Sequence, residues 1–277
     1  MSARAAGRRA GRRGGGATVN DDEFVYGRNP VRELVLAGRR EASELFATEQ
    51  ALAGADWLSA RRVIVRTRDQ LARLVGTGDH QGVVARVEPY PYVDLRELLG
   101  ADGPLICLDG AHDPRNLGAI ARVAEGAGAA GMIISPPGGA RGGAGVGQDP
   151  RRPGVELPAP RVGGERGVTG VVAKAWAGAV EHLPSARVGS ILAAVRDARG
   201  AGRPAFGAHP DGAEDYRTAH WIPQSLIVMG AEGEGLRPRV REACDLLVRI
   251  PMRGRVASLN ISVACGLLLY EAIRNTQ

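Results

Sequence analysis

The sequence predicts an α/β protein with two unequal domains: a small N-terminal α/β domain and a C-terminal domain built on a mainly parallel sheet covered on both faces. Three observations predict it. Short apolar runs typical of buried strands alternate with amphipathic helical stretches along most of the chain. A proline-bearing stretch near residue 90 divides that alternation. The 277 residues also suffice for two cores.

The chain begins with a basic segment that has almost nothing to bury. Residues 1–22 consist mainly of Arg, Gly and Ala, so we expect a disordered tail, either simply solvated or acting as a weak RNA-tethering arm. The net charge is +6, but five arginines in residues 1–20 and an excess of two in residues 137–170 leave about −1 elsewhere. Any contact of the folded parts with nucleic acid must therefore use a local patch.

The first domain is expected at residues 23–89. Its pattern predicts helices at 30–36 and 69–75 and strands at 44–47, 63–65 and 82–87. Residues 90–103 resemble a linker, because Tyr90-Pro91-Tyr92 disfavours both helix continuation and a central strand.

The second domain is expected at residues 104–277. In chain order the pattern predicts a strand at 105–108, a helix at 117–127, a strand at 131–134, helices at 171–181 and 190–199, a strand before His209, a strand at 225–229, a helix at 237–243, a strand at 246–250 and a C-terminal helix at 258–274. The strand before His209 contains Pro204, which predicts a poor central strand. Residues 137–170 are dense in Gly, Pro and Arg without periodicity, so we expect a disordered insert, whether a tolerated one or an RNA-binding one.

The cysteines and the hydropathy of the chain indicate the cellular compartment in which the protein works. Cys107, Cys244 and Cys265 are scattered and never form a CxxC pair, which argues against a disulfide framework and a zinc site. The longest apolar run is far short of the roughly 20 residues that cross a bilayer. We expect a cytoplasmic protein with no membrane partner and no metal.

Three polar clusters each follow a predicted strand, where a parallel sheet places its ligands. The first, Asp109 to Arg122, offers Asn116 and Arg122, although taken alone this segment is better explained by an N-cap and a solvated helix residue. The second is Met229-Gly230-Ala231-Glu232-Gly233-Glu234-Gly235, which does not match the glycine order of a dinucleotide site. The third, Ile250 to Asn260, contains Ser258, a natural N-cap, and Asn260, whose amide needs a partner.

The strings DPRNLGAIAR, VMGAEGEGL and IPMRGRVASLNISVA, in this order, resemble the three motifs of the SpoU (TrmH) branch of the SPOUT methyltransferases. Residues 24–87, with Tyr26-Gly27-Arg28-Asn29-Pro30 and His80-Gln81-Gly82-Val83, resemble the substrate-binding domain often attached. The likeness is strongest to the bacterial enzymes that methylate guanosine 2′-hydroxyls of 23S rRNA.

The resemblance implies a trefoil knot, a homodimer, and S-adenosyl-L-methionine as cofactor in 2′-O-methylation of an RNA ribose, most simply a guanosine of 23S rRNA, with DNA excluded as substrate. Pattern rules alone would exclude a knot. By position, Gly230, Ile250 and Leu259 would contact the cofactor. The catalytic and RNA-facing set would be Asn116, Arg122, Glu232, Ser258 and Asn260.

The chemistry is an in-line displacement in which a hydroxyl oxygen must be held and deprotonated. A guanidinium pKa above about 12 makes Arg122 a poor base. We therefore expect Arg122 to bind the target phosphate and stabilise the alkoxide, oriented by Glu232, while Asn116, Ser258 and Asn260 position it.

Other functions stay open at this point. The substrate could be tRNA or an antibiotic-target site on rRNA, and the chain could be a catalytically inactive RNA-binding relative. A dinucleotide-dependent oxidoreductase is disfavoured. Ala231, where many relatives carry asparagine, is a minor departure from the family pattern.

Overall fold

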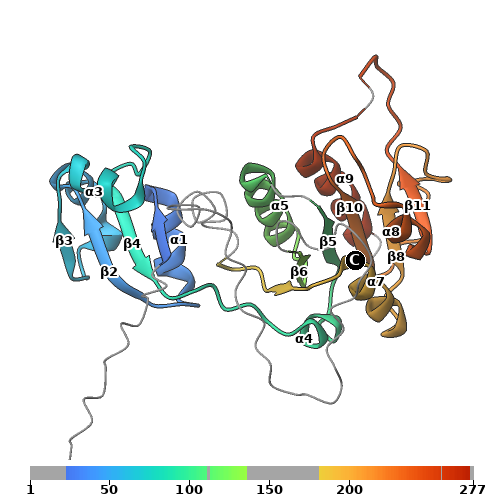
Figure 1. Ribbon diagram of the computed structural model, residues 1–277, viewed down its shortest axis with the longest axis horizontal. Coiled ribbons are helices and arrows are strands. Elements are labelled where there is room, and N and C mark those ends of the chain that lie inside the picture. The colour runs from blue at the N-terminus through green and yellow to red at the C-terminus, as the bar shows by residue number, and fades with distance from the viewer. Residues whose placement is uncertain (1–22, 111–112, 136–180, 257, 275–277) are drawn as a thin grey trace, which may run out of the picture.

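A computed structural model describes residues 23–110, 113–135, 181–256 and 258–274 (Figure 1). Three predictions fall outside these residues: the disordered tail at 1–22, the insert at 137–170, and all but Glu181 of the helix expected at 171–181. Within the described part, helices are too short or too polar for any of them to cross a membrane.

The N-terminal unit is a four-stranded sheet with helices on both faces. Its strands lie in the order β1 (Glu23–Tyr26), β4 (Val83–Val87), β2 (Ala42–Ala47) and β3 (Val63–Val65). Neighbouring residues of β1 point to opposite faces: Val25 packs with α1 (Arg28–Ala37), whereas Tyr26 packs with Leu71 of α3 (Arg68–Val75). The two predicted helices and three predicted strands are confirmed. The strand β1, the helix α2 (Glu49–Ala53) and the 3-10 helix Asp56–Leu58 were not predicted.

The expected linker at 90–103 is packed against the second unit. It contains α4 (Leu95–Leu99), whose N-cap Asp94 accepts a hydrogen bond from the N–H of Arg96. The buried guanidinium of Arg203 donates to the carbonyls of Leu99 and Gly103 at 2.9 Å, and to that of Ala101. These bonds fix the end of α4 beside the larger sheet, because buried carbonyls need donors.

The larger sheet has seven strands, and every pair is parallel. Its order is β7 (Ser185–Arg187), β6 (Gly131–Ile134), β5 (Leu105–Asp109), β10 (Leu226–Gly230), β8 (Ala205–Ala208), β11 (Leu246–Arg249) and β9 (Glu214–Asp215). The predicted central strands are confirmed. The edge strands β7 and β9 were not predicted.

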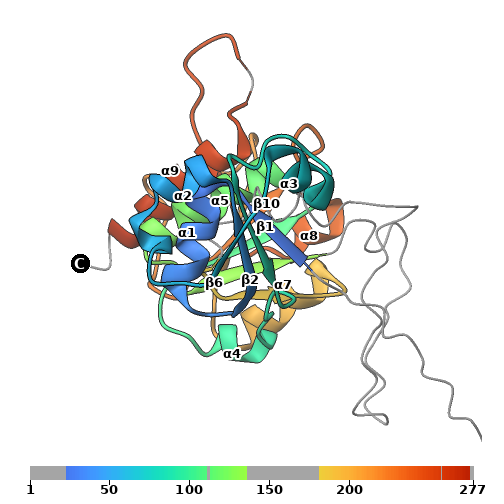
Figure 2. The ribbon, with the colours of Figure 1, turned by 90° about the vertical axis from the view of Figure 1, so that its left-hand side faces the viewer.

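Helices cover both faces of this sheet, as predicted (Figures 1 and 2). Ile106 and Leu108 of β5 pack with α5 (Pro114–Gly126) and α9 (Ile261–Arg274). Leu105 and Cys107 pack on the other face, with α7 (Ile191–Gly200) and α8 (Pro238–Ala243). Burial of both faces explains why the central strands are continuous apolar runs.

The structure corrects the prediction for the strand next to Pro204. Ala205–Ala208 forms β8 between β10 and β11, so this is a central strand. Pro204 lies one residue before it, where its carbonyl accepts a hydrogen bond from the N–H of Leu226 at 2.8 Å. The missing N–H of proline therefore interrupts no strand pairing.

The topology brings the three polar clusters to one edge of the sheet. Gly230 at the end of β10 pairs in register with Asp109 at the end of β5. The strand β11 runs parallel to β8 and so ends at the same edge. The trefoil knot implied by the resemblance stays a prediction.

Candidate active site

Asn116 joins the three loops that follow β5, β10 and β11. It lies in the first turn of α5 and is buried, with 8% of its surface exposed. Its amide nitrogen Nδ2 donates to Oε2 of Glu232 at 2.8 Å, and its Oδ1 accepts from Nδ2 of Asn260 at 2.9 Å. Asn116 thus forms one hydrogen-bonded row with two residues that follow it by 116 and 144 positions in the chain. Asn116 is within the helix and is not an N-cap.

Asn260, rather than Ser258, begins the C-terminal helix. The Oδ1 of Asn260 accepts from the N–H of Ser262 at 2.9 Å and from its Oγ at 2.6 Å, and its carbonyl accepts from the N–H of Ala264. This is N-cap geometry. The prediction of Ser258 as the N-cap is therefore wrong; Ser258 is exposed, two residues before Asn260.

Glu232 sits in a tight loop whose backbone is tied at its base. Ala231 and Gly235 exchange two backbone hydrogen bonds, of 3.0 and 2.9 Å. A Cβ at Gly230 would lie 2.1 Å from the backbone of Gly235, so only glycine fits there. This close packing explains why a glycine occupies position 230 without reference to a ligand. The loop leaves Glu232 exposed at its tip, apart from the bond to Asn116.

An ion pair between a buried carboxylate and a half-exposed arginine, not predicted from the sequence, fixes the other end of this loop. The carboxylate of Asp109, 1% exposed, accepts from the backbone N–H of Arg237 at 2.9 Å and from its Nε at 2.7 Å, and Nη2 lies 2.5 Å away. The loop carrying Glu232 is thereby clamped to the strand end from which Asn116 follows. Asp109 belongs to the first quoted cluster, but nothing in the sequence indicates Arg237 as its partner.

Arg122 lies apart from this row. It is exposed on α5, six residues after Asn116, and it has no hydrogen bond or ion pair with another residue that the structure describes. The expectation that Glu232 orients Arg122 is not met, since the Glu232 carboxylate binds Asn116 instead. Arg122 is available to a charged ligand.

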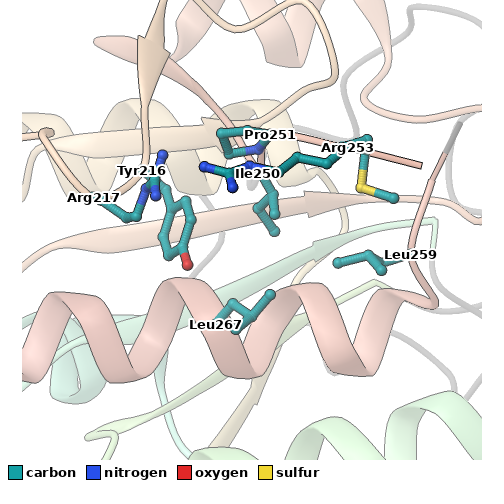
Figure 3. A pocket seen from close by; sticks show the side chains of 8 residues that line it. Tyr216, Arg217, Ile250, Pro251, Arg253, Leu259 and Leu267 are labelled. Atoms are coloured by element: carbon teal, nitrogen blue, oxygen red, sulfur yellow. The ribbon is translucent and has the colours of Figure 1, made fainter.

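A cavity of about 510 Å³ opens beside α9 (Figure 3). The loop after β11 lines one side with Ile250, Pro251, Met252, Arg253 and, further on, Leu259. Two predicted cofactor contacts, Ile250 and Leu259, thus face one space. Gly230, the third, is not among the lining residues.

The remaining lining residues were not predicted. They are Leu267 of α9 and the pair Tyr216 and Arg217, which follow β9. The guanidinium of Arg217 hydrogen-bonds both carboxylate oxygens of Asp215, at 2.9 and 2.6 Å, and these bonds lower the pKa of Asp215 to about 2. The surrounding segment has no hydrophobic period, so no signal marked it.

This arrangement suits polar recognition beside an apolar pocket. The row offers amide donors and a carboxylate that can hold a hydroxyl, and the cavity offers aliphatic walls. No group of three or more His, Cys, Asp or Glu side chains suited to a metal gathers within the described ranges.

Two family models match the chain. The SpoU rRNA Methylase family matches residues 160–270, and the RNA 2′-O ribose methyltransferase substrate-binding family matches residues 24–93. The methylase match includes the loops after β10 and β11, which carry Glu232 and Asn260. The substrate-binding match covers the N-terminal sheet.

Individual proteins are similar over most of their length. A TrmH family tRNA/rRNA methyltransferase of Bacillus subtilis is 35% identical, covering 91% of this chain and 95% of the relative. The 23S rRNA (guanosine-2′-O-)-methyltransferase RlmB of Ralstonia nicotianae is 38% identical over 77% of each chain. The crystal structure of the SpoU methyltransferase AviRb from Streptomyces viridochromogenes, solved with AdoMet, has a TM-score of 0.67 and 26% identity, covering 92% of this chain and 90% of AviRb.

Proposed function

The chain belongs to the SpoU (TrmH) family of RNA methyltransferases, and we propose that it methylates the 2′-hydroxyl of a guanosine ribose in 23S rRNA. Whichever RNA it acts on, it is an S-adenosylmethionine-dependent RNA 2′-O-ribose methyltransferase. The observation that carries the proposal is the hydrogen-bonded row of Glu232, Asn116 and Asn260 at one edge of the sheet.

The choice of 23S rRNA is supported by the RlmB relative. The name of the Bacillus relative covers both tRNA and rRNA, which makes tRNA the second candidate. A ribose hydroxyl is the same on every nucleotide, so the target must be selected by RNA shape and neighbouring contacts. The N-terminal unit, similar to a substrate-binding family, would make those contacts.

The cavity fits the cofactor by size and chemistry. Ligand sites typically span about 300 to 1,000 Å³ with mainly apolar walls, and this one of about 510 Å³ has Ile250, Leu259 and Leu267 among its lining residues. When bound, S-adenosylmethionine supplies a methyl group on a positively charged sulfur. Ile250 and Leu259 would hold it from the side of the loop after β11. Gly230 would help to place the loop after β10 beside the cofactor, because its backbone packs closely against that of Gly235.

Within the proposed mechanism the row orients the ribose. Asn116 and Asn260 hold each other and Glu232 in fixed directions, while Glu232 keeps Oε1 without a hydrogen-bond partner among the described residues. That oxygen would accept a hydrogen bond from the 2′-hydroxyl, orient the hydroxyl oxygen for in-line displacement, and receive its proton as the oxygen is methylated. Ser258, exposed beside Leu259, would contact the same nucleotide.

Arg122 would bind the phosphate beside the target ribose and stabilise the developing alkoxide by its charge. Its exposure and lack of a partner among the described residues suit a substrate-binding role. A guanidinium stays protonated at neutral pH, so Arg122 would not remove the proton itself.

A homodimer in the cytoplasm completes the proposal. Val263, Leu267 and Tyr270 form an apolar stripe on α9, with 52, 38 and 54% of their surfaces exposed. A second copy would cover this stripe, which adjoins the cavity through Leu267. The three unpaired cysteines are compatible with a reducing compartment.

The decisive experiment incubates the purified protein with labelled S-adenosylmethionine and, separately, rRNA and tRNA from a strain lacking its gene. A methylated ribose blocks alkaline cleavage of the next phosphodiester bond, which locates the product. We expect label at one 2′-O-methylguanosine of 23S rRNA. Label in tRNA alone would contradict the 23S assignment, and no label in either RNA would support an inactive RNA-binding relative.

A further inference from the structure

The loop between β11 and α9, described over residues 250–256 and 258–260, projects away from the sheet in both views (Figures 1 and 2). It carries Arg253 and Arg255, both exposed. Neither arginine has a hydrogen bond or an ion pair with any other residue in the described part of the chain. The loop therefore presents two guanidinium groups to solvent.

No acidic residue compensates these charges nearby in the sequence. Asp and Glu are absent between Asp245 and Glu271. The other arginine of this stretch, Arg249, is held by the carbonyls of Gly212 and Ala213 at 2.8 Å and does not belong to the surface pair. Solvated surface arginines are common, so position decides whether the pair has a role.

Their position links the two halves of the candidate site. Arg253 lines the cavity together with Leu259 (Figure 3). Arg255 lies between them in the chain, five residues before Asn260, but it is not a lining residue. A ligand that touches both arginines must extend from the cavity out along the loop, which a small cofactor inside the cavity would not do.

We propose that Arg253 and Arg255 bind the phosphodiester backbone of the substrate RNA next to the target nucleotide. The proposal rests on the proposed function, since it requires RNA at the row of Asn116, Glu232 and Asn260. A guanidinium binds a phosphate with two parallel hydrogen bonds. Phosphate contacts position a nucleic acid without reading its sequence. The loop thus places the ribose, and other parts of the protein select it.

The test compares two double variants with equal loss of charge. One is R253A/R255A. The control, R239A/R241A, removes two exposed arginines of α8, which covers the opposite face of the sheet from α9. Binding of the RNA fraction that the wild-type enzyme methylates is measured over a series of KCl concentrations. Affinity for S-adenosylhomocysteine is measured separately.

We expect R253A/R255A to reduce the slope of log affinity against log salt by about one per arginine, because each phosphate contact releases counterions. The KM for RNA should rise. In the single variant R255A, whose changed residue does not line the cavity, the affinity for S-adenosylhomocysteine should stay at the wild-type value. R253K/R255K should keep the wild-type slope, since lysine retains the charge. The control variant should match wild type throughout.

A slope equal to that of the control would overturn the inference. So would weaker binding of S-adenosylhomocysteine with an unchanged RNA slope, which would assign Arg253 to the cofactor. Either result with an active wild-type enzyme leaves the proposed function standing. A wild-type enzyme that methylates neither rRNA nor tRNA contradicts the proposed function instead.

Discussion

Asn116 holds the candidate site together because it uses both ends of one amide. It donates to Glu232 and accepts from Asn260, so it fixes the orientation of a carboxylate and of a second amide at once. Asn260 in turn is oriented by the helix start that it caps. Each side chain in the row is thereby held by a neighbour before any substrate binds, which is how a site lowers the cost of ordering.

Replacing Asn116 with alanine should lower kcat for methyl transfer by roughly 100-fold or more, the usual effect of losing one positioned polar group. Affinity for S-adenosylhomocysteine, measured by calorimetry, should stay near wild type, because Asn116 does not line the cavity. Glu125→Ala, at an exposed glutamate of the same helix α5, is the control and should keep full activity. Equal activity in the two variants would remove Asn116 from the mechanism.

The three cysteines should be inert in the folded protein. Burial raises the pKa of Cys107 well above that of a free thiol, and it raises the pKa of both Cys244 and Cys265 to about 12. Only the thiolate reacts, so at pH 8 all three stay protonated and unreactive. A thiol reagent should titrate none in the native protein and three in denaturant. Rapid labelling of a native thiol would contradict this.

The residues that form the candidate site could be predicted from the sequence only in part. Asn116, Glu232 and Asn260 each follow an apolar strand, and a parallel sheet gathers such positions at one edge. The N-cap was predicted at Ser258 because serine is a common N-cap, whereas the helix begins two positions later and Asn260 is the N-cap. Tyr216 and Arg217 reach the cavity from a segment without periodicity, which carries no local signal.

At the scale of elements, the ion pair between Asp109 and Arg237 ties the end of β5 to the start of α8. Asp109→Asn should lower the free energy of unfolding by about 2 kcal/mol, since it weakens charged hydrogen bonds in a buried site. Glu44→Gln breaks a half-exposed pair with Arg86 and should cost under about 1 kcal/mol. Urea unfolding of both variants measures the difference. Similar losses of unfolding free energy in both variants would mean that the burial of Asp109 does not strengthen its ion pair.

Long apolar elements were predictable and short ones were not. The run at 105–108 is buried on both faces and therefore stands out. The edge strands Ser185–Arg187 and Glu214–Asp215 are polar and short, and they exist because a neighbouring strand offers hydrogen bonds. Such pairing depends on residues far away in the chain, so no local pattern reports it.

At the scale of the whole molecule, the apolar stripe on α9 predicts the oligomeric state. Leu267→Asp combined with Tyr270→Asp should convert a dimer to a monomer, because two charges would be buried without partners at the interface. Light scattering after size-exclusion chromatography measures the mass. Leu36→Asp, at an exposed leucine of α1, is the control and should leave the mass unchanged. A monomeric wild-type protein would contradict the prediction.

The proposed function requires that three loops far apart in the chain form one site for a methyl donor and a ribose. A crystal structure with S-adenosylhomocysteine tests this directly. We predict the ligand in the cavity between Ile250 and Leu259, with its sulfur toward the row of Glu232, Asn116 and Asn260. Ligand bound elsewhere, or a sulfur facing away from that row, would contradict it.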